Sequence, residues 1–300
     1  MSVAPLDVVV VTYGAQDLVR ACLRSVRDHA PAGSRVQVVD NASPDGTADV
    51  VAAEFPEVEL LRQPGNSGFA VANNRAVRRS DAPYVLILNP DAQLEADTLP
   101  HLLAVMADDE RIGVLGCRLL KADGTLDHAA KRMLPTPGDA LRYFVPARLR
   151  RRASRYTAPH VGERDVAEVD AVNGAFMLVR RAAVDEVGLL DESYWMYGED
   201  LDWCARFRQR GWKVVYDGRV VAHHLKAGSS GAARPWRLNY HFHRSMDVFF
   251  RRHTSSGRAL VDLPVRAGIW ARFVLVASRD ELRRAVARSR ERRATQVAAS

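Results

Sequence analysis

Three carboxylates lie within four residues in the stretch YGEDLD, at Glu199, Asp200 and Asp202. Their mutual repulsion can raise the pKa of one of them into the range that suits a general base. A structural role explains the same pattern, because acidic residues stabilise the first turn of a helix and Asp202 can pair with Arg206 one turn later. Taken alone, the cluster favours the structural role. The preceding Trp195 offers a flat face for a sugar ring, or a plain core side chain.

A further carboxylate, Asp91, stands directly after an apolar run. Residues 84–88 read YVLIL, and Asn89-Pro90-Asp91 follows. Proline cannot continue a strand ladder, and it holds the residue before it in an extended conformation. The pattern predicts a buried strand that ends at this point, so that the Asp91 side chain is available to a ligand.

The elements that must position these residues follow an alternating pattern. Strands are predicted at 6–11, 36–39, 58–61 and 84–88, and helices at 15–28, 47–55 and 67–79. This alternation is typical of a parallel α/β sheet, in which ligands bind at the carboxyl ends of the strands. Thr12, Tyr13, Asp40 and Asp91 all fall at such ends. We therefore expect one ligand site along this edge of the sheet.

The second half of the chain is less regular. Residues 135–168 are rich in proline and arginine and show little periodicity, which predicts a long, irregular insertion. The chain from about residue 235 is predicted to be helical. The other elements predicted after residue 95 are helices at 98–107, 181–187 and after Gly198, and strands at 113–120 and 213–216. Regular structure is expected to return at 169–180.

The composition limits the class of protein. Three cysteines without CxxC spacing indicate neither a zinc knuckle nor a disulfide framework, and they fit a reducing, cytosolic setting. No segment approaches the roughly 18 to 20 apolar residues of a membrane span. The N-terminus lacks the basic flank of a signal peptide.

The formal net charge of +7 is concentrated in two segments. Residues 142–155 carry six arginines and no acid, and residues 279–293 carry seven arginines and three acids, so the remainder of the chain is slightly acidic. A protein that binds duplex DNA more often spreads basic residues over a docking face. Two basic strips fit an anionic membrane surface, and they fit two solvated surfaces equally well.

Seven segments, taken together and in order, resemble the family 2 glycosyltransferases. The resemblance is to the rhamnosyltransferase-like branch, and within it to actinobacterial enzymes that act on polyprenyl-diphosphate-linked N-acetylglucosamine. The segments are VVVVTYG (8–14), VVDNASPDGT (38–47), GNSGFAVANNRA (65–76), YVLILNPDA (84–92), VNGAFMLVRR (172–181), YWMYGEDLDWCARFRQRGWKVVY (194–216) and VVAHHLKAGSSG (220–231).

The resemblance implies an α/β fold of the GT-A type, with a mostly parallel central sheet flanked by helices. It covers residues 6 to about 231, so we expect a glycosyltransferase domain at 1–231 that contains the 135–168 insertion. Residues 232–300 would form a helical, basic C-terminal extension.

The same resemblance implies a nucleotide-sugar donor, with dTDP-rhamnose favoured. Asp40 would read the nucleotide base, and Thr12 and Tyr13 would line the same pocket. Asn66 and Gly68 would lie against the nucleotide, where glycine allows close backbone approach. Asn73 and Asn74 could each contact the ligand or cap a helix.

A divalent metal, Mg²⁺ or Mn²⁺, is implied by the position of Asp91, which matches the last aspartate of the family's DxD motif. Asn89 replaces the first aspartate, and its amide is a weaker ligand for a hard cation. The late histidine of the family matches His223 or His224, and the sequence leaves open which of the two would be the ligand.

For catalysis, the resemblance assigns the role of general base to Asp200. This residue would take a proton from the acceptor hydroxyl as that oxygen attacks the donor sugar, in a single displacement that inverts the anomeric centre. Gly174, Ala175, Trp195 and Glu199 would form the acceptor side. The acceptor implied is a polyprenyl-linked or glycan substrate of cell-wall or surface polysaccharide synthesis.

The C-terminal extension contains a pattern typical of a basic amphipathic helix. Val265, Ile269, Phe273 and Ala277 recur at four-residue spacing. Such a helix can lie in a membrane interface or pack on the protein itself. We expect a cytoplasmic protein, peripheral on the inner face of the cell membrane, and a homodimer contact is a further role open to this segment.

Two rival hypotheses belong to other classes. A non-catalytic nucleotide- or carbohydrate-binding domain could keep the same fold, although Asp40, Asp91 and Asp200 are all present. A nucleic-acid-binding protein is suggested only by the basic pI, and we expect no nucleic-acid partner because no recognition motif is visible. UDP-galactose and UDP-N-acetylglucosamine are alternative donors.

Overall fold

The computed structural model describes residues 5–135, 155–226 and 235–298, with the side chains of the last helix described as far as residue 285. The chain divides into two compact units. Unit 1 comprises residues 1–135 and 151–226, and unit 2 comprises residues 136–150 and 227–300. The last boundary between the units, at residues 226–227, lies five residues before the predicted domain boundary after residue 231.

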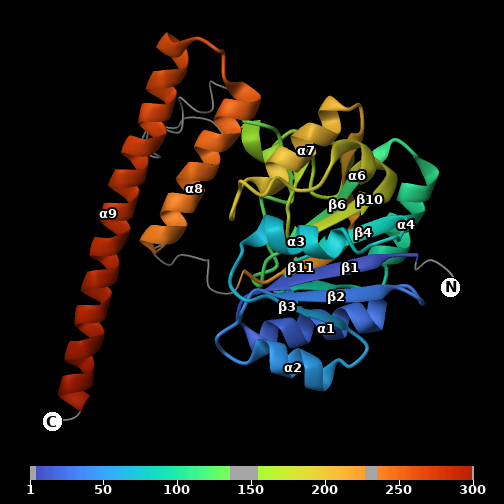
Figure 1. Ribbon diagram of the computed structural model, residues 1–300, viewed down its shortest axis with the longest axis horizontal. Coiled ribbons are helices and arrows are strands. Elements are labelled where there is room, and N and C mark those ends of the chain that lie inside the picture. Colours follow the sequence, from blue (N-terminus) through green and yellow to red (C-terminus); the bar gives the residue numbers. More distant parts are fainter. Residues whose placement is uncertain (1–4, 136–154, 227–234, 299–300) are drawn as a thin grey trace. The chain divides into compact units, whose positions relative to one another are not determined.

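Unit 1 is an α/β layer structure (Figure 1). The alternation predicted for its first hundred residues is confirmed. Its elements in chain order are β1 (Asp7–Thr12), α1 (Gln16–His29), β2 (Arg35–Asp40), α2 (Thr47–Glu54), β3 (Glu59–Arg62), α3 (Phe69–Val77), β4 (Tyr84–Leu88), β5 (Ala92–Leu94), α4 (Thr98–Asp108), β6 (Ile112–Leu120), β7 (Lys131–Arg132), η2 (Arg155–Thr157), β8 (Val166–Glu168), β9 (Ala171–Val172), β10 (Phe176–Arg180), α6 (Arg181–Val187), α7 (Glu199–Gln209) and β11 (Lys213–His224).

The central sheet of unit 1 has the strand order β3-β2-β1-β4-β10-β6-β11-β5, and β8 pairs with β11. Strands β1, β2, β3 and β4 are parallel, and β6 is parallel to β11. Strand β10 is antiparallel to both β4 and β6. The carboxyl ends of β1, β2, β4, β6 and β11 therefore lie at one edge of the sheet, together with the amino end of β10.

Burial on both faces explains the valine- and leucine-rich strands. Every residue of β1 is buried, and so are the last four residues of β4. Such strands read as continuous apolar runs because helices cover both sides of a parallel sheet. Helix α1 contributes one apolar face, formed by Val19, Cys22, Leu23 and Val26, all buried. This packing fixes where each strand ends.

The structure corrects the predicted second half of unit 1 in three places. Residues 166–168, expected to belong to an irregular insertion, form β8 against β11; residues 136–154 of that insertion lie outside the described residues. Strand β11 runs on to His224, well past the predicted 213–216. The short strands β5 and β7 were not predicted, because two or three residues show no periodicity.

Unit 2 contains an antiparallel helical hairpin in its described part. Helix α8 (Trp236–Phe249) passes through the π-helical turn η3 (Phe250–Thr254) to the 40-residue helix α9 (Ala259–Ala298). Asp247 near the end of α8 pairs with Arg266 near the start of α9, and Asn239 near the start of α8 contacts Asp280. These contacts fix the antiparallel register.

The predicted apolar face of the amphipathic helix α9 packs on α8. Ile269, Phe273 and Ala277 are buried. The Phe273 ring lies 5.4 Å from Trp236 and 6.0 Å from Tyr240, measured between ring centroids. This face is therefore an internal seam of the hairpin. Among the described residues, no helix is both long and apolar enough to cross a membrane.

Candidate active site

The predicted site residues converge on one edge of the sheet. Thr12 and Asp40 end β1 and β2 and face each other in register. Asn89 and Asp91 follow β4, and His224 ends β11. The Gly174-Ala175 pair comes directly before β10, which runs in the opposite direction, so it reaches the same edge. The topology thus places residues more than 200 positions apart along one border.

The part of the site that is predicted to bind the donor contains Asp40. Its side chain is buried, and its Oδ2 accepts a hydrogen bond of 3.1 Å from the backbone N–H of Ser43. Its Oδ1 is buried and has no hydrogen-bond partner among the described residues. A buried carboxylate oxygen without a donor is costly, and a ligand N–H would satisfy it. Thr12 differs, since its hydroxyl is committed to Gly14 O, while the Tyr13 side chain is exposed.

The loop at 65–68 is tied to the end of β2. Asn41, which sequence reasoning did not single out, donates from Nδ2 to the carbonyl of Gly68 and accepts from the hydroxyl of Ser67. Asn66 Oδ1 in turn accepts from the N–H of Gly68. Asn66 and Gly68 are therefore held beside Asp40 by defined contacts.

Gly68 also meets the aromatic segment before α7. Its φ is +89°, and a Cβ placed there would lie 2.3 Å from the carbonyl oxygen of Trp195. The N–H of the next residue, Phe69, donates to that same carbonyl at 2.8 Å. Only glycine allows this approach. The contact links the predicted donor loop to the predicted acceptor residue Trp195.

The two asparagines of α3 have different surroundings. Asn74 is buried, and its side-chain amide hydrogen-bonds both the N–H and the carbonyl of Leu190, so its role is structural. Asn73 donates to Phe69 O, while its Oδ1 is buried and unpartnered among the described residues. The structure thus separates two residues that the sequence left equivalent.

His224, and not His223, faces Asp91. The Nε2 atom of His224 lies 3.4 Å from Asp91 Oδ1. Adjacent residues of a strand point to opposite faces, and His223 accordingly pairs with Glu95 at 2.9 Å. Of the two candidate ligands, only His224 is brought to the predicted metal residue.

Asp127, which sequence reasoning missed, orients the His224 ring. Its Oδ2 lies 3.0 Å from His224 Nδ1, and Lys226 and Asn173 also bind this carboxylate. Burial alone would lower the pKa of His224, but the hydrogen bonds with Asp127 and Asp91 outweigh it and raise the pKa to about 9. Burial raises the pKa of Asp127, yet hydrogen bonds from His224 and Lys226 leave it well below its usual range.

This arrangement fits partial ligation of a divalent cation. A carboxylate that holds one ring nitrogen leaves the other free to bind a metal, which is the usual surrounding of a ligating histidine. Within the described residues, no group of three or more His, Cys, Asp or Glu side chains has the geometry of a complete site. Asp91 and His224 could therefore supply two ligands, with the remainder coming from a bound diphosphate.

Asp200 is held in a defined orientation at the start of α7. Its Oδ2 lies 2.6 Å from Nη2 of Arg132 and accepts the N–H of Gly174 at 3.0 Å. Both side chains of the ion pair are almost fully buried. Burial would lower the pKa of Arg132, but Asp200 outweighs it and raises that pKa, so the guanidinium stays charged. A Cβ on Gly174 would lie 3.4 Å from Asp200 Cβ, so the small residue lies directly against the carboxylate.

The other two carboxylates of the cluster differ from Asp200. Asp202 pairs with Arg206 at 2.8 Å, which confirms the predicted i, i+4 contact. Glu199 is 7% exposed, and its Oε2 has no hydrogen-bond partner in the described part of the chain. Burial, followed by the charge of Asp200, raises the pKa of Glu199 to about 8. The cluster thus holds one ion pair with Arg206, one with Arg132, and one carboxyl that favours its protonated form.

Arg132 and Asp127 carried no motif in the sequence. Asp127 lies in irregular chain and Arg132 in the two-residue strand β7, and neither kind of segment shows a hydrophobic periodicity. The sequence offered a signal only for Arg132, since the charged pair KR at 131–132 stands between the apolar pairs AA and ML.

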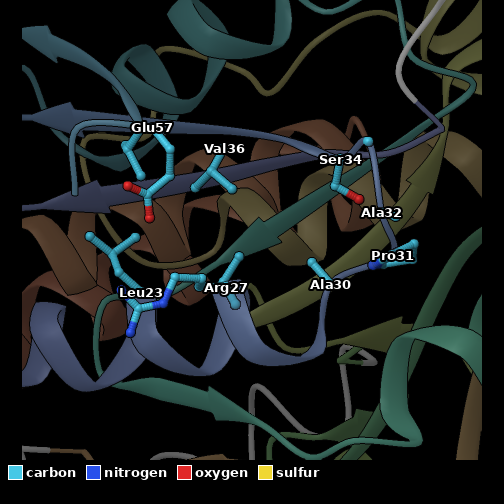
Figure 2. Close-up of a pocket in the computed structure, with 11 residues that line it drawn as sticks. Leu23, Arg27, Ala30, Pro31, Ala32, Ser34, Val36 and Glu57 are labelled. Atoms are coloured by element: carbon cyan, nitrogen blue, oxygen red, sulfur yellow. The ribbon is translucent and has the colours of Figure 1, made fainter.

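A pocket in unit 1 lies away from these residues. It is bordered by the end of α1, the loop 30–34 and the chain before β3, and Figure 2 shows Arg27 and Glu57 at its rim. These segments are at the amino ends of β2 and β3, the edge opposite Asp40. None of the predicted site residues lines it.

Comparisons with known proteins show the family of this chain. The profile of "Glycosyl transferase family 2" matches residues 7–188. The chain is 32% identical over 295 residues to the N-acetylglucosaminyl-diphospho-decaprenol L-rhamnosyltransferase of Mycobacterium tuberculosis, covering 93% of this chain and 94% of that protein. It is 27% identical to the rhamnosyltransferase WbbL of Escherichia coli, over 59% of this chain and 70% of WbbL.

Solved structures show the same fold. The mannosyltransferase PcManGT of Pyrobaculum calidifontis, in complex with GDP-Man and Mn²⁺, superposes with a TM-score of 0.59 at 19% identity, covering 96% of this chain and 76% of PcManGT. GalNAc-T7 with UDP, GalNAc and Mn²⁺ gives a TM-score of 0.60 at 13% identity, over 89% and 54% of the two chains. The predicted GT-A fold is confirmed, and the chain belongs to glycosyl transferase family 2.

Proposed function

We propose that this glycosyltransferase transfers rhamnose from dTDP-rhamnose to a polyprenyl-diphosphate-linked N-acetylglucosamine in cell-wall synthesis. The observation that carries the proposal is the 32% identity along nearly the whole length of a relative named for that acceptor and sugar. The geometry is consistent with it, since base, nucleotide and metal candidates share one edge of the sheet. Asp40 would bind the nucleotide base through its unsatisfied Oδ1.

Asp200 would act as the general base. It would accept the proton of the acceptor hydroxyl while that oxygen forms a bond to C1 of the sugar. The C1–O bond to the diphosphate breaks at the same time, and the nucleoside diphosphate leaves with the electron pair. A single displacement of this kind inverts the anomeric centre. Arg132 would hold the carboxylate in place against Gly174, where the acceptor would enter.

Asp91 and His224 would hold a divalent metal, Mg²⁺ or Mn²⁺, against the donor diphosphate. When bound, the metal would stabilise the negative charge that develops on the leaving group. Asp127 would keep Nε2 of His224 directed at the metal, because its own contact is with Nδ1. Asn89 would contribute hydrogen bonds to the donor in preference to metal ligation.

The reaction would take place at the inner face of the cell membrane. A polyprenyl-linked acceptor remains in the bilayer, so the enzyme must reach it there as a peripheral protein. The charge of unit 2 supports this location: it holds 18 arginines and 6 acidic residues, whereas unit 1 is slightly acidic.

The proposal is tested by a transfer assay with purified protein, Mn²⁺ and a polyprenyl-diphosphate N-acetylglucosamine acceptor. We expect product with dTDP-rhamnose and little or none with UDP-galactose or UDP-N-acetylglucosamine. Chelation of the metal should stop transfer, and NMR of the product should show the anomer opposite to that of the donor. Binding of nucleotide without transfer or hydrolysis of any donor would instead support the non-catalytic binding domain.

A further inference from the structure

Helix α9 has a second apolar face, which points away from α8. On a helix with 3.6 residues per turn, one side carries Leu260, Leu263, Val274, Leu275 and Leu282, which fall within about a third of the circumference. All five are exposed, Leu260 by 92%, Leu275 by 72% and Leu282 by 66%. We call these five residues the outer stripe.

Small residues fill the gaps in the outer stripe. Ala267, Ala271 and Ser278 lie between its large side chains on the same side of the helix, and all three are exposed. No acidic residue interrupts this side within the described part of α9. Asp280 is buried and contacts Asn239, and Glu281 binds the N–H of Trp236, so both are directed to α8.

Arginines form one edge of the outer stripe. By helical position Arg272, Arg279 and Arg283 lie together, next to Leu275 and Leu282, and Arg279 and Arg283 are exposed. An apolar face with basic residues along its side is the pattern of a helix that lies in the plane of a membrane interface. The basic edge complements anionic headgroups, to which each arginine near the surface adds attraction.

We infer that the outer stripe and its arginine edge dock unit 2 onto the surface of an anionic bilayer. The choice of partner rests on the proposed lipid-linked acceptor and on the charge of unit 2, which has 18 arginines and no lysine among 24 charged residues. A second copy of the chain fits less well. An isologous contact would bring the same arginine edges near each other, and like charges would oppose it.

The test is co-sedimentation of the full chain with phosphatidylcholine vesicles, with and without phosphatidylglycerol, at low and high salt. The wild type should bind the anionic vesicles and be released by salt. Arg279→Gln with Arg283→Gln should weaken that binding roughly fivefold for each arginine. Leu275→Gln with Leu282→Gln should weaken it at both salt concentrations, because the apolar contact is not screened.

Matched controls come from unit 1. Arg24→Gln with Arg111→Gln removes two exposed arginines, and Val166→Gln removes an exposed apolar side chain; both should bind vesicles like the wild type. Circular dichroism verifies that the α9 variants stay helical. Equal vesicle binding by the wild type and both α9 variants would overturn the inference. So would a leucine variant that changes only the oligomeric state in light scattering, since the stripe would then belong to a second copy.

Transfer assays separate this inference from the proposed function. The α9 variants should transfer to a short, soluble acceptor like the wild type and more slowly to a polyprenyl-linked acceptor in vesicles. A protein that binds vesicles through the stripe and yet transfers to neither acceptor would retain the docking surface and contradict the proposed reaction.

Discussion

At the scale of single residues, the pair Arg132–Asp200 determines how the candidate base behaves. The guanidinium of Arg132, on β7, lies 2.6 Å from the carboxylate. Arg132 and the backbone N–H of Gly174 bind the same carboxylate oxygen, Oδ2. Arg132 therefore acts as a positioning residue for Asp200.

We expect Arg132→Gln to slow transfer by about tenfold or more, since Asp200 then loses the contact that orients its carboxylate toward Gly174. Donor binding should change little. Arg206→Gln is the matched control, because Arg206 holds Asp202 on the same helix and does not touch Asp200. An Arg132→Gln enzyme that transfers as fast as the wild type, or that loses nucleotide binding together with transfer, would contradict the positioning role.

The raised pKa of Glu199 should make the stability of the folded protein depend on pH. Its pKa is about 8 in the folded protein, against an ordinary value of 4.5, because of burial and the Asp200 charge, with Arg132 opposing the shift. A carboxyl whose folded pKa is raised stabilises the fold when protonated, and that contribution is lost as the pH rises from about 4.5 through 8.

Glu199→Gln should therefore raise the melting temperature at pH 8 more than at pH 5, by about 2–4 °C for each kcal/mol regained. Thermal unfolding across this pH range measures the effect, and exposed Glu57→Gln serves as control. An equal change at both pH values would contradict a folded-state pKa of about 8 for Glu199.

We expect Asp127 to affect metal binding indirectly, through its contact with His224. Asp127→Asn removes the carboxylate that holds His224 Nδ1, and loss of such a partner typically weakens metal affinity by about 10- to 100-fold. Calorimetry of dTDP binding with and without Mn²⁺ measures it directly. His223→Ala, on the other face of β11, should behave like the wild type. If His223→Ala lost the Mn²⁺ effect and Asp127→Asn kept it, the assignment of His224 as the metal ligand would be wrong.

At the scale of elements, the contact between the loop before α3 and the segment before α7 depends on one glycine. Gly68→Ala would place Cβ 2.3 Å from the Trp195 carbonyl at a φ of +89°. Either the loop or the aromatic segment must move, at a cost of about 1–3 kcal/mol in strain.

We expect Gly68→Ala to lower both the melting temperature and the transfer rate. Gly65→Ala is the control in the same loop, since a Cβ there meets nothing within 4 Å. Equal behaviour of the two variants in unfolding and transfer assays would mean that the Trp195 contact is unimportant.

At the scale of the whole molecule, the division into two units predicts separable functions. All strands of the central sheet and every candidate site residue lie before Lys226, within unit 1. A chain that ends at Lys226 should bind dTDP with Mn²⁺ almost as the full chain does, and should lose vesicle binding. Calorimetry and co-sedimentation measure the two properties. A folded fragment that no longer binds nucleotide would show that unit 2 contributes to the donor site.

Local patterns in the sequence determined the elements of unit 1 and several candidate residues. The apolar run at 84–88 and the proline after it define β4 and the position of Asp91, because strand formation and its end depend on neighbouring residues. The same holds for α1 and for the Asp202–Arg206 pair, whose partners are four residues apart. Motif resemblance supplied the family and the fold, both of which the comparisons confirm.

Tertiary structure alone decided which partners these residues meet. Arg132 reaches Asp200 across 68 positions and Asp127 reaches His224 across 97, and no periodicity specifies a contact at such separations. The alternation of β11 against its neighbours directs His224 to Asp91 and His223 to Glu95. The apolar spacing of α9 identified the face that carries Ile269, Phe273 and Ala277, but only the packing of α8 decided that this face lies inside the hairpin and that the outer stripe stays exposed. The physical reason is common to all three: a sequence encodes the pattern of each element, whereas the pairing between elements depends on how the chain packs them.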